Sequence, residues 1–550
     1  MPAGRPKPPS LALGTQGAVS SQAALATDVG QAILQKDGNA VDAAVAVGFA
    51  LAVTHPSAGN LGGGGFMVVR LADGTSRTLD YRETAPAAAS RDMYLDKDGK
   101  PTKDSLIGPK AAGIPGSVAG LAEAHKTLGR LSWKEVLAPA IKLAKEGQIL
   151  DAYHAKDING GVTKIKAAGF AETAKLYEKP DGTAWAAGDT WKQPALAKTL
   201  ETIAESGPAA FYEGAIATAM VDEVKKAGGI WTSADLAGYR AKWREPVRFT
   251  YRGHEVVTMP PPSAGGVVLR QLLAASEVMH MERATWRSAD EVHLFAEACR
   301  RTYADRNQLL ADPDFVKIPL ATLLDPAYTA TRVADIDPEH ATPSDKVKAG
   351  IALGAESEQT THYSVVDRDG TAVATTTTLN TGYGAKFAAS TVGVLLNNEM
   401  DDFAVKPGTP NVFGLVQGER NKIEPGKRML SSMTPTILAK DGDLRAVLGS
   451  PGGPTISTVV AQVTRALVDY DRPLDEAVAA FRVHHQWLPD AIWAEEKMPA
   501  DVEAALEAKG HFIKKRPAIG DANSIEVDPK TRGFRAVADT SRGGGKAAAY

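Results

Sequence analysis

The sequence contains one cysteine, Cys299, among its 550 residues. A single cysteine excludes an intramolecular disulfide and any metal cluster built on several thiolates. Cys299 follows Val292 and Phe295 at spacings of seven and four residues, which places the three side chains on one helix face. This pattern favours a buried core thiol over a nucleophile. Ser288 and Glu291 predict a capping box where that helix begins.

Long hydrophobic runs are also missing. The longest, 43–54, is about half the length of a membrane-spanning helix and follows Asp42, so it predicts a buried helix. The start of the sequence is polar and proline-rich, and no apolar stretch precedes a small-residue cleavage site. We therefore expect no targeting segment in this sequence.

An excess of charge of either sign is absent too. The sequence has 62 Lys and Arg against 65 Asp and Glu, which gives a formal net charge of −3. This near-balance argues against nucleic acid or an anionic membrane as a partner. Hydrophobic residues make up 44% of the chain, and 52 glycines and 33 prolines indicate a globular protein with many turns.

Several common catalytic motifs do not occur. The sequence has no G-x-S-x-G elbow, no phosphate-binding G-x-x-x-x-G-K-[ST] loop and no H-E-x-x-H zinc motif. The four glycines at 62–65 precede a predicted strand and do not open a helix, which argues against a phosphate cradle. His484 and His485 are adjacent, so their side chains diverge, and a structural role is favoured over metal binding.

Periodicity predicts helices in the first half and hairpins throughout. Helices are expected over 21–35, 40–53 and within 116–150 and 193–228. Asp-Gly turns between apolar runs predict four hairpins, which lie at 66–81, 362–378, 435–448 and 524–538. Long helices with many antiparallel strands predict helices packed on the outside of stacked sheets.

Polar residues of chemical interest gather in the last third of the chain. Residues 344–359 are small, polar and unpatterned, and they run directly into a strand that begins at Thr360. A flexible tail that meets a strand is a plausible proteolytic site, although composition alone favours a surface loop. The following hairpin brings Thr378 back towards Thr360. Thr378 and Asn380 share one strand face by the period of two.

Three further segments bear polar or flexible residues. A carboxylate cluster occupies 397–403, and Gly452-Gly453 follow a predicted strand. Paired glycines let backbone N–H groups approach a ligand, as in an oxyanion hole, but a tight turn explains them equally well. The stretch 407–426 is rich in Pro and Gly and is long for a plain connection, so it is either a lid or a solvated loop.

Together these segments resemble the γ-glutamyltransferases, a family of N-terminal-nucleophile hydrolases. The resemblance extends over roughly residues 17 to 540 and follows the order of the family's motifs. The segments that carry it include GNAVDAAVAVGFALAVTHP (38–56), GNLGGGGFM (59–67), YRETAP (81–86), MPPPSAGG (259–266), TTHYSVVD (360–367), TLNTGYG (378–384), LLNNEMDDF (395–403), LSSMTPT (430–436) and GSPGG (449–453).

The resemblance assigns a role to each residue that matches a family motif. It implies that cleavage between Gln359 and Thr360 frees Thr360 as the nucleophile, which Thr378 then hydrogen-bonds. The residues implied to form the oxyanion hole are Gly452 and Gly453. The residues implied to hold the substrate α-carboxylate are Arg82, Ser431 and Ser432. Those implied to surround its α-amino group are Asn380, Glu399 and Asp402, and Phe413 is the aromatic residue of an implied lid.

These assignments agree with elementary chemistry. Threonine alone is a poor nucleophile, but the free α-amine of an N-terminal Thr360 has an ordinary pKa near 7.7–8.0 and can serve as its general base. The guanidinium of Arg82 matches a carboxylate in fork geometry, and acidic side chains match an ammonium group. The resemblance implies that no metal or organic cofactor is required.

The resemblance also implies an α+β fold, a four-layer α-β-β-α sandwich. Autocleavage would give a large subunit, 1–359, and a small subunit, 360–550, which form one structural unit as a heterodimer. The expected substrates are glutathione and other γ-glutamyl compounds, with water, an amino acid or a dipeptide as acceptor. By resemblance to bacterial members we expect a periplasmic or secreted protein, although without a signal peptide the cytoplasm stays open.

Two other functions fit parts of the sequence. An acylase for cephalosporin or glutaryl amides could use the same scaffold, but such enzymes do not need carboxylates for a substrate ammonium group. Arg82, Asp402 and the two serines at 431–432 therefore favour γ-glutamyl substrates. A non-catalytic amino-acid-binding protein would not need the Thr360 motif or the paired glycines.

Overall fold

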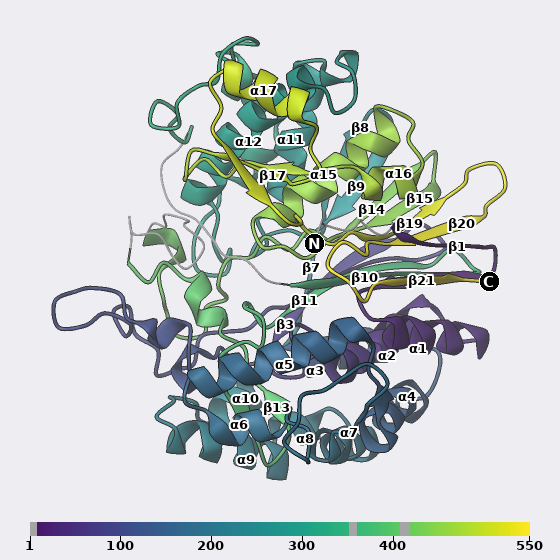
Figure 1. Ribbon diagram of the computed structural model, residues 1–550, viewed down its shortest axis with the longest axis vertical. Coiled ribbons are helices and arrows are strands. Elements are labelled where there is room, and N and C mark those ends of the chain that lie inside the picture. The colour runs from purple at the N-terminus through teal and green to yellow at the C-terminus, as the bar shows by residue number, and fades with distance from the viewer. Residues whose placement is uncertain (1–7, 351–359, 407–418) are drawn as a thin grey trace.

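Two stacked β-sheets form the centre of the protein, and helices cover their outer faces (Figure 1). The computed structural model describes residues 8–350, 360–406 and 419–550. Each of the two sheets has seven strands, and all neighbouring strands within them are antiparallel. The expected α+β, four-layer α-β-β-α sandwich is confirmed.

Both sheets combine strands from before and after Thr360. The first sheet contains, in spatial order, β1 (Ser10–Gly14), β20 (Phe534–Ala538), β19 (Asn523–Val527), β15 (Asp443–Leu448), β14 (Thr436–Lys440), β9 (His254–Thr258) and β8 (Val247–Tyr251). The second contains β21 (Lys546–Ala549), β2 (Gly17–Ser21), β10 (Thr361–Asp367), β11 (Ala372–Thr378), β3 (Gly64–Arg70), β4 (Ser76–Tyr81) and β7 (Lys242–Arg244). The four predicted hairpins are confirmed as β3–β4, β10–β11, β14–β15 and β19–β20.

Separate helical layers pack on the two sheets. The layer on the second sheet contains α1 (Ala24–Gln35), α2 (Ala40–Thr54), α3 (Ser117–Leu128), α4 (Trp133–Glu146), α5 (Ala152–Ala167), α6 (Ala171–Lys175), α7 (Pro194–Ser206), α8 (Ala209–Tyr212), α9 (Gly214–Lys226) and α10 (Ser233–Gly238). The layer on the first sheet contains α11 (Gly265–Val278), α12 (Ala289–Leu309), α13 (Leu320–Leu324), α14 (Pro326–Val333), α15 (Thr455–Val468), α16 (Leu474–Ala479) and α17 (Ala500–Ala508).

Short strands complete the structure outside the sandwich. They are β5 (Gln148–Ile149) with β6 (Thr190–Trp191), β12 (Ala388–Ala389) with β13 (Val394–Leu395), and β16 (Val483–His484) with β17 (Ile492–Glu495) and β18 (Ile513–Arg516). The predicted structural role of the adjacent histidines fits their contacts. His484 bonds Thr458 and Gln486, and His485 bonds Asp490.

The core lies in three layers that follow from the sequence pattern. All fifteen residues of α2 are buried, as its continuous apolar run predicts. Its N-terminus is closed by a capping box between Asn39 and Asp42. Between the sheets, small and β-branched side chains such as Val68, Val366 and Val447 interdigitate. This central layer sets the distance between the sheets and therefore the position of the ends of their strands.

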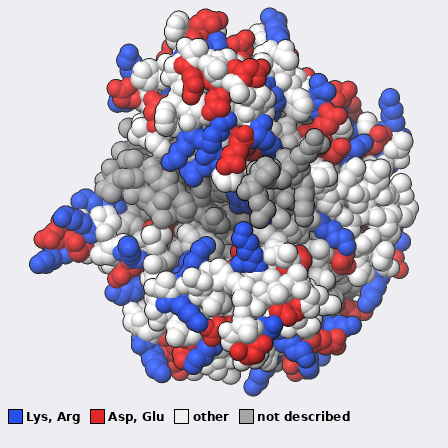
Figure 2. Space-filling model, viewed as in Figure 1, with Lys and Arg blue, Asp and Glu red and all other residues white. Residues whose placement is uncertain are grey.

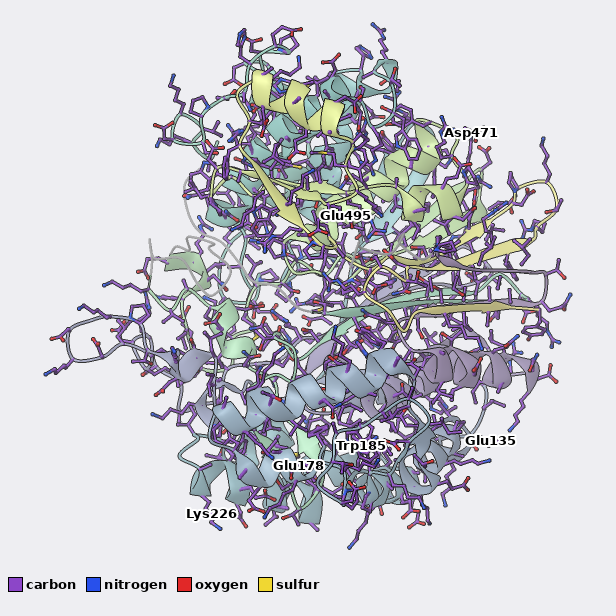
Figure 3. The ribbon with its side chains drawn as sticks, viewed as in Figure 1. Glu135, Glu178, Trp185, Lys226, Asp471 and Glu495 are labelled. Atoms are coloured by element: carbon purple, nitrogen blue, oxygen red, sulfur yellow. The ribbon has the colours of Figure 1, made fainter. Side chains whose placement is uncertain are left out.

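Helix caps show where local sequence signals hold and where tertiary contacts override them. At α4, where Figure 3 labels Glu135, both halves of the box form. Ser132 accepts from the Glu135 N–H, and the Glu135 carboxylate accepts from the Ser132 N–H. At α12 the predicted box is only half right. Ser288 caps the Glu291 N–H, but the Glu291 carboxylate pairs with Arg465 of α15 instead. Cys299 is buried in this helix, and burial raises the pKa of its thiol.

The segment that leads towards Thr360 is partly anchored. Sequence composition predicts a flexible tail over 344–359, but its first residues are held by side chains. Trp487 Nε1 donates to the carbonyl of Ser344 at 2.9 Å, and the Gly350 N–H donates to Asp305 at 2.8 Å. The unpatterned sequence conceals these contacts because the partner side chains come from distant elements. Residues 351–359 lie outside the described part of the chain.

Charged side chains of both signs are interspersed over the face in Figure 2, in keeping with the small net charge. Basic side chains also gather near the middle of this view. Within the described ranges, no helix has the length and apolar character needed to cross a bilayer.

Candidate active site

Thr360 lies at the start of a central strand, opposite Thr378. It is 7% exposed and immediately precedes β10. In the β10–β11 register Thr361 pairs with Thr377, so one further step places Thr360 across from Thr378. Residues opposite each other in an antiparallel pair have Cα atoms about 4.5–5.5 Å apart. The predicted return of Thr378 towards Thr360 is confirmed.

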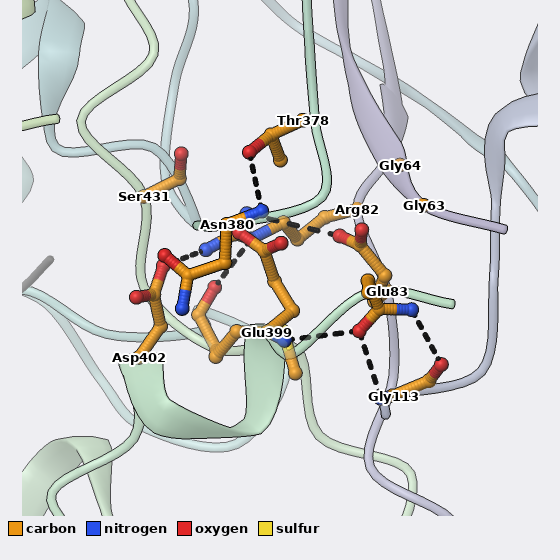
Figure 4. A network of polar contacts seen from close by, with 12 residues as sticks. Gly63, Gly64, Arg82, Glu83, Gly113, Thr378, Asn380, Glu399, Asp402 and Ser431 are labelled. Carbon is orange, nitrogen blue, oxygen red and sulfur yellow. Dashed lines mark hydrogen bonds and ion pairs between the residues drawn. The ribbon is translucent and has the colours of Figure 1, made fainter. Parts of the chain in front are cut away.

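Thr378 and Asn380 are joined by a tight turn at the end of β11. The Thr378 hydroxyl accepts from the Asn380 N–H at 2.7 Å (Figure 4). Asn380 has a φ of 72°, in the left-handed region, and its side chain donates to the carbonyl of Asn398 at 2.9 Å. Strand alternation therefore does not set its direction, and the prediction of a shared strand face is wrong. The turn keeps both side chains in the site.

The four-glycine run allows close packing beside Thr378. A Cβ on Gly63 would lie 2.0 Å from the Thr378 carbonyl oxygen, and one on Gly64 would lie 2.6 Å from a Glu83 carboxylate oxygen. No side chain larger than hydrogen fits at such distances. The run leads into a strand and does not open a helix, as predicted, but β3 begins at Gly64 and so includes the last two glycines of the run. The glycines provide packing space for the site.

A buried cluster of one guanidinium and three carboxyl groups lies next to this turn (Figure 4). Arg82 follows β4 and pairs through its two terminal nitrogens with Glu399 and with Asp402, which belong to the short helix η4 (Glu399–Asp402). Arg82 is 1% exposed, and a Glu83 carboxylate oxygen lies 3.7 Å from it. The structure therefore brings together the residues implied to hold the two ends of an α-amino acid, but it pairs them with each other.

Burial makes two carboxyl groups of this cluster, those of Glu83 and Glu399, hard to ionise. It raises the pKa of Glu83 to about 8, although the neighbouring Arg82 opposes the shift. Burial also raises the pKa of Glu399 well above its usual range, again against the effect of Arg82. Neither Glu83 oxygen has a hydrogen-bond partner among the described residues. Protonation of both Glu83 and Glu399 leaves one carboxylate against the one guanidinium, so the raised pKa values of these two groups bring the buried cluster towards neutrality.

The serine pair lies in a loop that is fixed to Arg82. The guanidinium donates to the carbonyl oxygens of Met429 at 3.2 Å and Leu430 at 3.1 Å. Ser431 donates its N–H to Pro262, and Ser432 accepts from Arg306 at 2.5 Å. Both serines are 3% exposed. The three residues implied to hold an α-carboxylate are thus brought together by hydrogen bonds from Arg82 to the backbone of the serine loop.

Gly452 and Gly453 form a turn with the expected features of an oxyanion hole. Their φ angles are 131° and 59°, in the region that favours glycine, and Pro454 alone separates them from α15. Neither backbone N–H has an acceptor among the described residues. Unpaired N–H groups at the start of a helix are well suited to a developing negative charge.

This turn lies against the strand of Thr360. A Cβ on Gly449 would be 2.1 Å from the ring of His362, so the loop after β15 touches β10 two residues from Thr360. Burial lowers the pKa of His362 to about 3, and its ring nitrogens are bound to Thr376 and Ser364. His362 is therefore neutral and bonded within the core, so it is not free to act as a general base near neutral pH.

Sequence reasoning missed supporting residues of the site. Asn397 accepts from the N–H groups of Gly113 and Glu399 and so positions η4. Glu83 contacts Arg82 in the buried cluster, and Arg306 bonds Ser432 in the serine loop. Asn397 lies in the motif LLNNEMDDF near Glu399, and Glu83 lies in YRETAP next to Arg82. This proximity in sequence was the signal that could have identified them as site residues. Gln359 and Phe413 lie outside the described residues, and their implied roles stay predictions.

The fold and this site define a class. Two antiparallel sheets between helical layers, with a threonine at the head of a central strand, are the architecture of an N-terminal-nucleophile hydrolase. A family model described as Gamma-glutamyltranspeptidase matches residues 26–550. The chain belongs to the γ-glutamyltranspeptidase family.

Individual relatives agree with this membership. The chain is 48% identical over 515 residues to the glutathione hydrolase proenzyme of Escherichia coli (strain K12), covering 94% of this chain and 88% of the relative. It is 38% identical over 528 residues to the acylase ACY 1 proenzyme of Pseudomonas sp. (strain V22), covering 94% and 91%. The crystal structure of cephalosporin acylase from Bacillus halodurans matches with a TM-score of 0.87 at 26% identity, covering 100% and 98%.

Proposed function

We propose that the protein is a γ-glutamyltransferase and glutathione hydrolase. It cleaves the γ-glutamyl amide of glutathione and related compounds, and passes the acyl group to water or to an amino acid or dipeptide acceptor. Family membership and the E. coli relative support this activity. The observation that carries it is the buried cluster of Arg82 with Glu399 and Asp402 beside Thr360 and Thr378.

The cluster matches the head group of a γ-glutamyl compound, which carries an ammonium and a carboxylate on one carbon. Without substrate, Arg82 pairs with Glu399 and Asp402. A zwitterion can bind by exchanging ion pairs. Its carboxylate pairs with Arg82, and its ammonium group pairs with the carboxyl groups that Arg82 releases. The net charge of the buried site does not change. A ligand with only one of the two groups would leave a buried charge unpaired, which is costly.

Maturation frees the nucleophile. The Thr360 hydroxyl oxygen attacks the carbonyl carbon of Gln359, the peptide C–N bond breaks, and the acyl group moves from nitrogen to oxygen as an ester. Water then opens the ester, which leaves a carboxyl group on 1–359 and a free amine on 360–550. The relatives named as proenzymes support this maturation.

Turnover repeats the same chemistry on the substrate. The Thr360 amine takes the hydroxyl proton, the oxygen attacks the γ-carbonyl carbon, and the oxyanion is stabilised by the N–H groups of Gly452 and Gly453. The intermediate collapses as the C–N bond breaks and the leaving amine takes the proton. Water or an acceptor amine then attacks the γ-glutamyl ester on Thr360 and restores the hydroxyl group.

An acylase for cephalosporin or glutaryl amides is the second candidate, because solved and curated relatives carry that name. A glutaryl group has the terminal carboxylate but no ammonium. It would engage Arg82 and leave Glu399 and Asp402 without a cation in a buried site. This imbalance favours γ-glutamyl substrates over glutaryl ones.

The test compares the two substrate classes directly. Purified mature protein is incubated with glutathione, with γ-glutamyl p-nitroanilide and with glutaryl p-nitroanilide, each with and without glycylglycine. We expect release of glutamate from both γ-glutamyl compounds, and γ-glutamyl-glycylglycine when the dipeptide is present. Faster cleavage of the glutaryl anilide would overturn the proposal in favour of the acylase.

We also propose a periplasmic or secreted site of action and a role in glutathione metabolism, on the resemblance to bacterial members of the family. Fractionation of cells that express the complete gene would test the location. Activity released with the periplasm supports it, and activity confined to the cytosol contradicts it.

A further inference from the structure

A buried arginine lies behind the serine pair. Arg306, near the end of α12, is 1% exposed, and its Nη2 donates to the Ser432 hydroxyl oxygen at 2.5 Å. Its Nη1 donates to Asn307 at 3.2 Å. None of the sequence motifs assigned to recognition contains it. We propose that Arg306 is a positioning residue for the substrate α-carboxylate, acting through Ser432; this rests on the proposed function.

The contact with Arg306 fixes the direction of the Ser432 hydroxyl proton. A guanidinium has donors and no acceptor, so Ser432 can only accept from Arg306. The Ser432 hydroxyl has one proton, which must therefore lie on the side away from Arg306. Ser431 is in the same situation, because its hydroxyl accepts from the Met433 N–H at 3.2 Å. Each serine hydroxyl oxygen thus accepts a hydrogen bond from a protein donor, and its O–H group points away from that donor.

The backbone just before the serine pair is bonded to the guanidinium of Arg82. The serines follow Leu430, whose carbonyl oxygen accepts from Arg82 at 3.1 Å. A carboxylate that engages Arg82 therefore meets the serine loop at once. Two O–H donors of fixed direction favour an acceptor with several lone pairs over an ammonium, which can only donate.

The same face of α12 reaches the oxyanion turn. Tyr303 lies one helical turn before Arg306, with its ring centroid 5.8 Å from the guanidinium carbon. Its hydroxyl donates to the carbonyl of Pro454, which follows Gly453. Helix α12 is therefore the common support of the carboxylate loop and of the glycine pair. Arg306 acts on recognition, which separates its effect from that of Tyr303.

The experiment uses inhibitors that differ in one group. L-Glutamate and 4-aminobutyrate share the ammonium group and the chain, but only glutamate has the α-carboxylate. Their inhibition constants are measured against γ-glutamyl p-nitroanilide with the mature protein. For Arg306→Met we expect the constant for glutamate to rise about tenfold or more, and that for 4-aminobutyrate to change less than about twofold.

Arg270→Met is the matched control. Arg270 on α11 is 7% exposed, donates to the Leu324 carbonyl at 3.0 Å and lies 5.1 Å from the Phe249 ring, so its loss is structurally comparable. It should leave the ratio of the two inhibition constants unchanged. In a Ser432→Ala background, Arg306→Met should add less than about twofold, because its effect passes through Ser432.

Several outcomes would overturn the inference. They are an equal rise in both constants, an unchanged ratio, or an effect of Arg306→Met that persists in full without Ser432. If Arg306→Met does not fold, Arg306→Lys retains a buried donor and should raise the glutamate constant alone, by about three- to fivefold. A wild type that does not cleave the anilide contradicts the proposed function itself, whereas an active wild type with an unchanged ratio contradicts only the role of Arg306.

Discussion

At the scale of single residues, recognition depends on charges that are buried together. Arg82 is held between Glu399 and Asp402, and both contacts cross more than three hundred positions of sequence. The motifs identified each residue through resemblance to the family. They could not show that the residues pair in the absence of substrate, because nothing local in the sequence records contacts across such separations.

Asp402→Asn should change which acyl groups the enzyme accepts. The variant keeps the shape of the side chain but removes the charge that balances a substrate ammonium. We expect the ratio of kcat/KM for γ-glutamyl over glutaryl p-nitroanilide to fall about 10- to 100-fold. Asp401→Asn is the control, because the carboxylate of the neighbouring Asp401 accepts a hydrogen bond from Ser105. A ratio that does not fall in Asp402→Asn would remove this residue from ammonium binding.

Glu83 should make stability depend on pH. Its pKa is raised from an ordinary 4.5 to about 8, so between these values the folded protein holds a proton that the unfolded chain has lost. The stabilisation is complete below about pH 4.5 and is lost as the pH rises through about 8. Glu83→Gln cannot ionise, so its unfolding free energy relative to wild type should increase by on the order of 3 kcal/mol from pH 5 to pH 8.

Urea unfolding of both proteins at the two pH values measures this difference. If the unfolding free energy changes equally in wild type and Glu83→Gln between pH 5 and pH 8, Glu83 is ionised in the folded protein at both pH values. No sequence pattern indicates this proton, because its cause is the complete burial of Glu83 next to Gly64.

At the scale of elements, the helices and hairpins could be predicted well because their signals are local. Asp-Gly turns and alternating apolar residues are properties of a few neighbouring positions. Predictions were weaker where a distant element intervenes. The Glu291 carboxylate pairs with Arg465 and does not complete the predicted capping box. Asn380 has a positive φ in the turn where it bonds Asn398.

The glycine turn before α15 should act on the rate of reaction more than on binding. In Gly452→Ala a Cβ would lie 2.4 Å from the Thr455 hydroxyl oxygen at a φ of 131°, so the turn and its N–H groups must shift. These donors engage only as the oxyanion forms. We therefore expect kcat to fall about 100-fold or more with little change in KM.

Gly442→Ala is the matched control for backbone strain. Gly442 also has a positive φ, of 87°, but it lies in a hairpin turn where an added Cβ would meet no described atom within 4 Å. It should lower stability slightly and leave kcat unchanged. Equal losses of kcat in both variants would show that the effect at Gly452 is general strain.

At the scale of the whole molecule, the cleavage point divides the chain but not the fold. The first sheet takes β1, β8 and β9 from before Thr360, and the second takes β10, β11 and β21 from after it. Each sheet would lose interior strands if one piece were removed, which leaves unpaired backbone groups and an exposed core.

Neither piece should therefore fold alone. We expect 1–359 and 360–550, expressed separately, to be insoluble or to lack cooperative unfolding. Co-expression in one cell should give a soluble complex that copurifies. A separately expressed piece with native-like circular dichroism and a sharp thermal transition would show that the proposed subunits are independent domains.

Thr360 is proposed here as the nucleophile, both of its own release and of turnover. The most direct test is the intact mass and N-terminal sequence of purified wild type and of Thr360→Ala. We expect two wild-type fragments that together equal the 57.8 kDa chain plus one water, with threonine at the new N-terminus. For Thr360→Ala we expect one uncleaved, inactive chain. Efficient cleavage of that variant at the same bond, or an active wild type that stays a single chain, would contradict this role of Thr360.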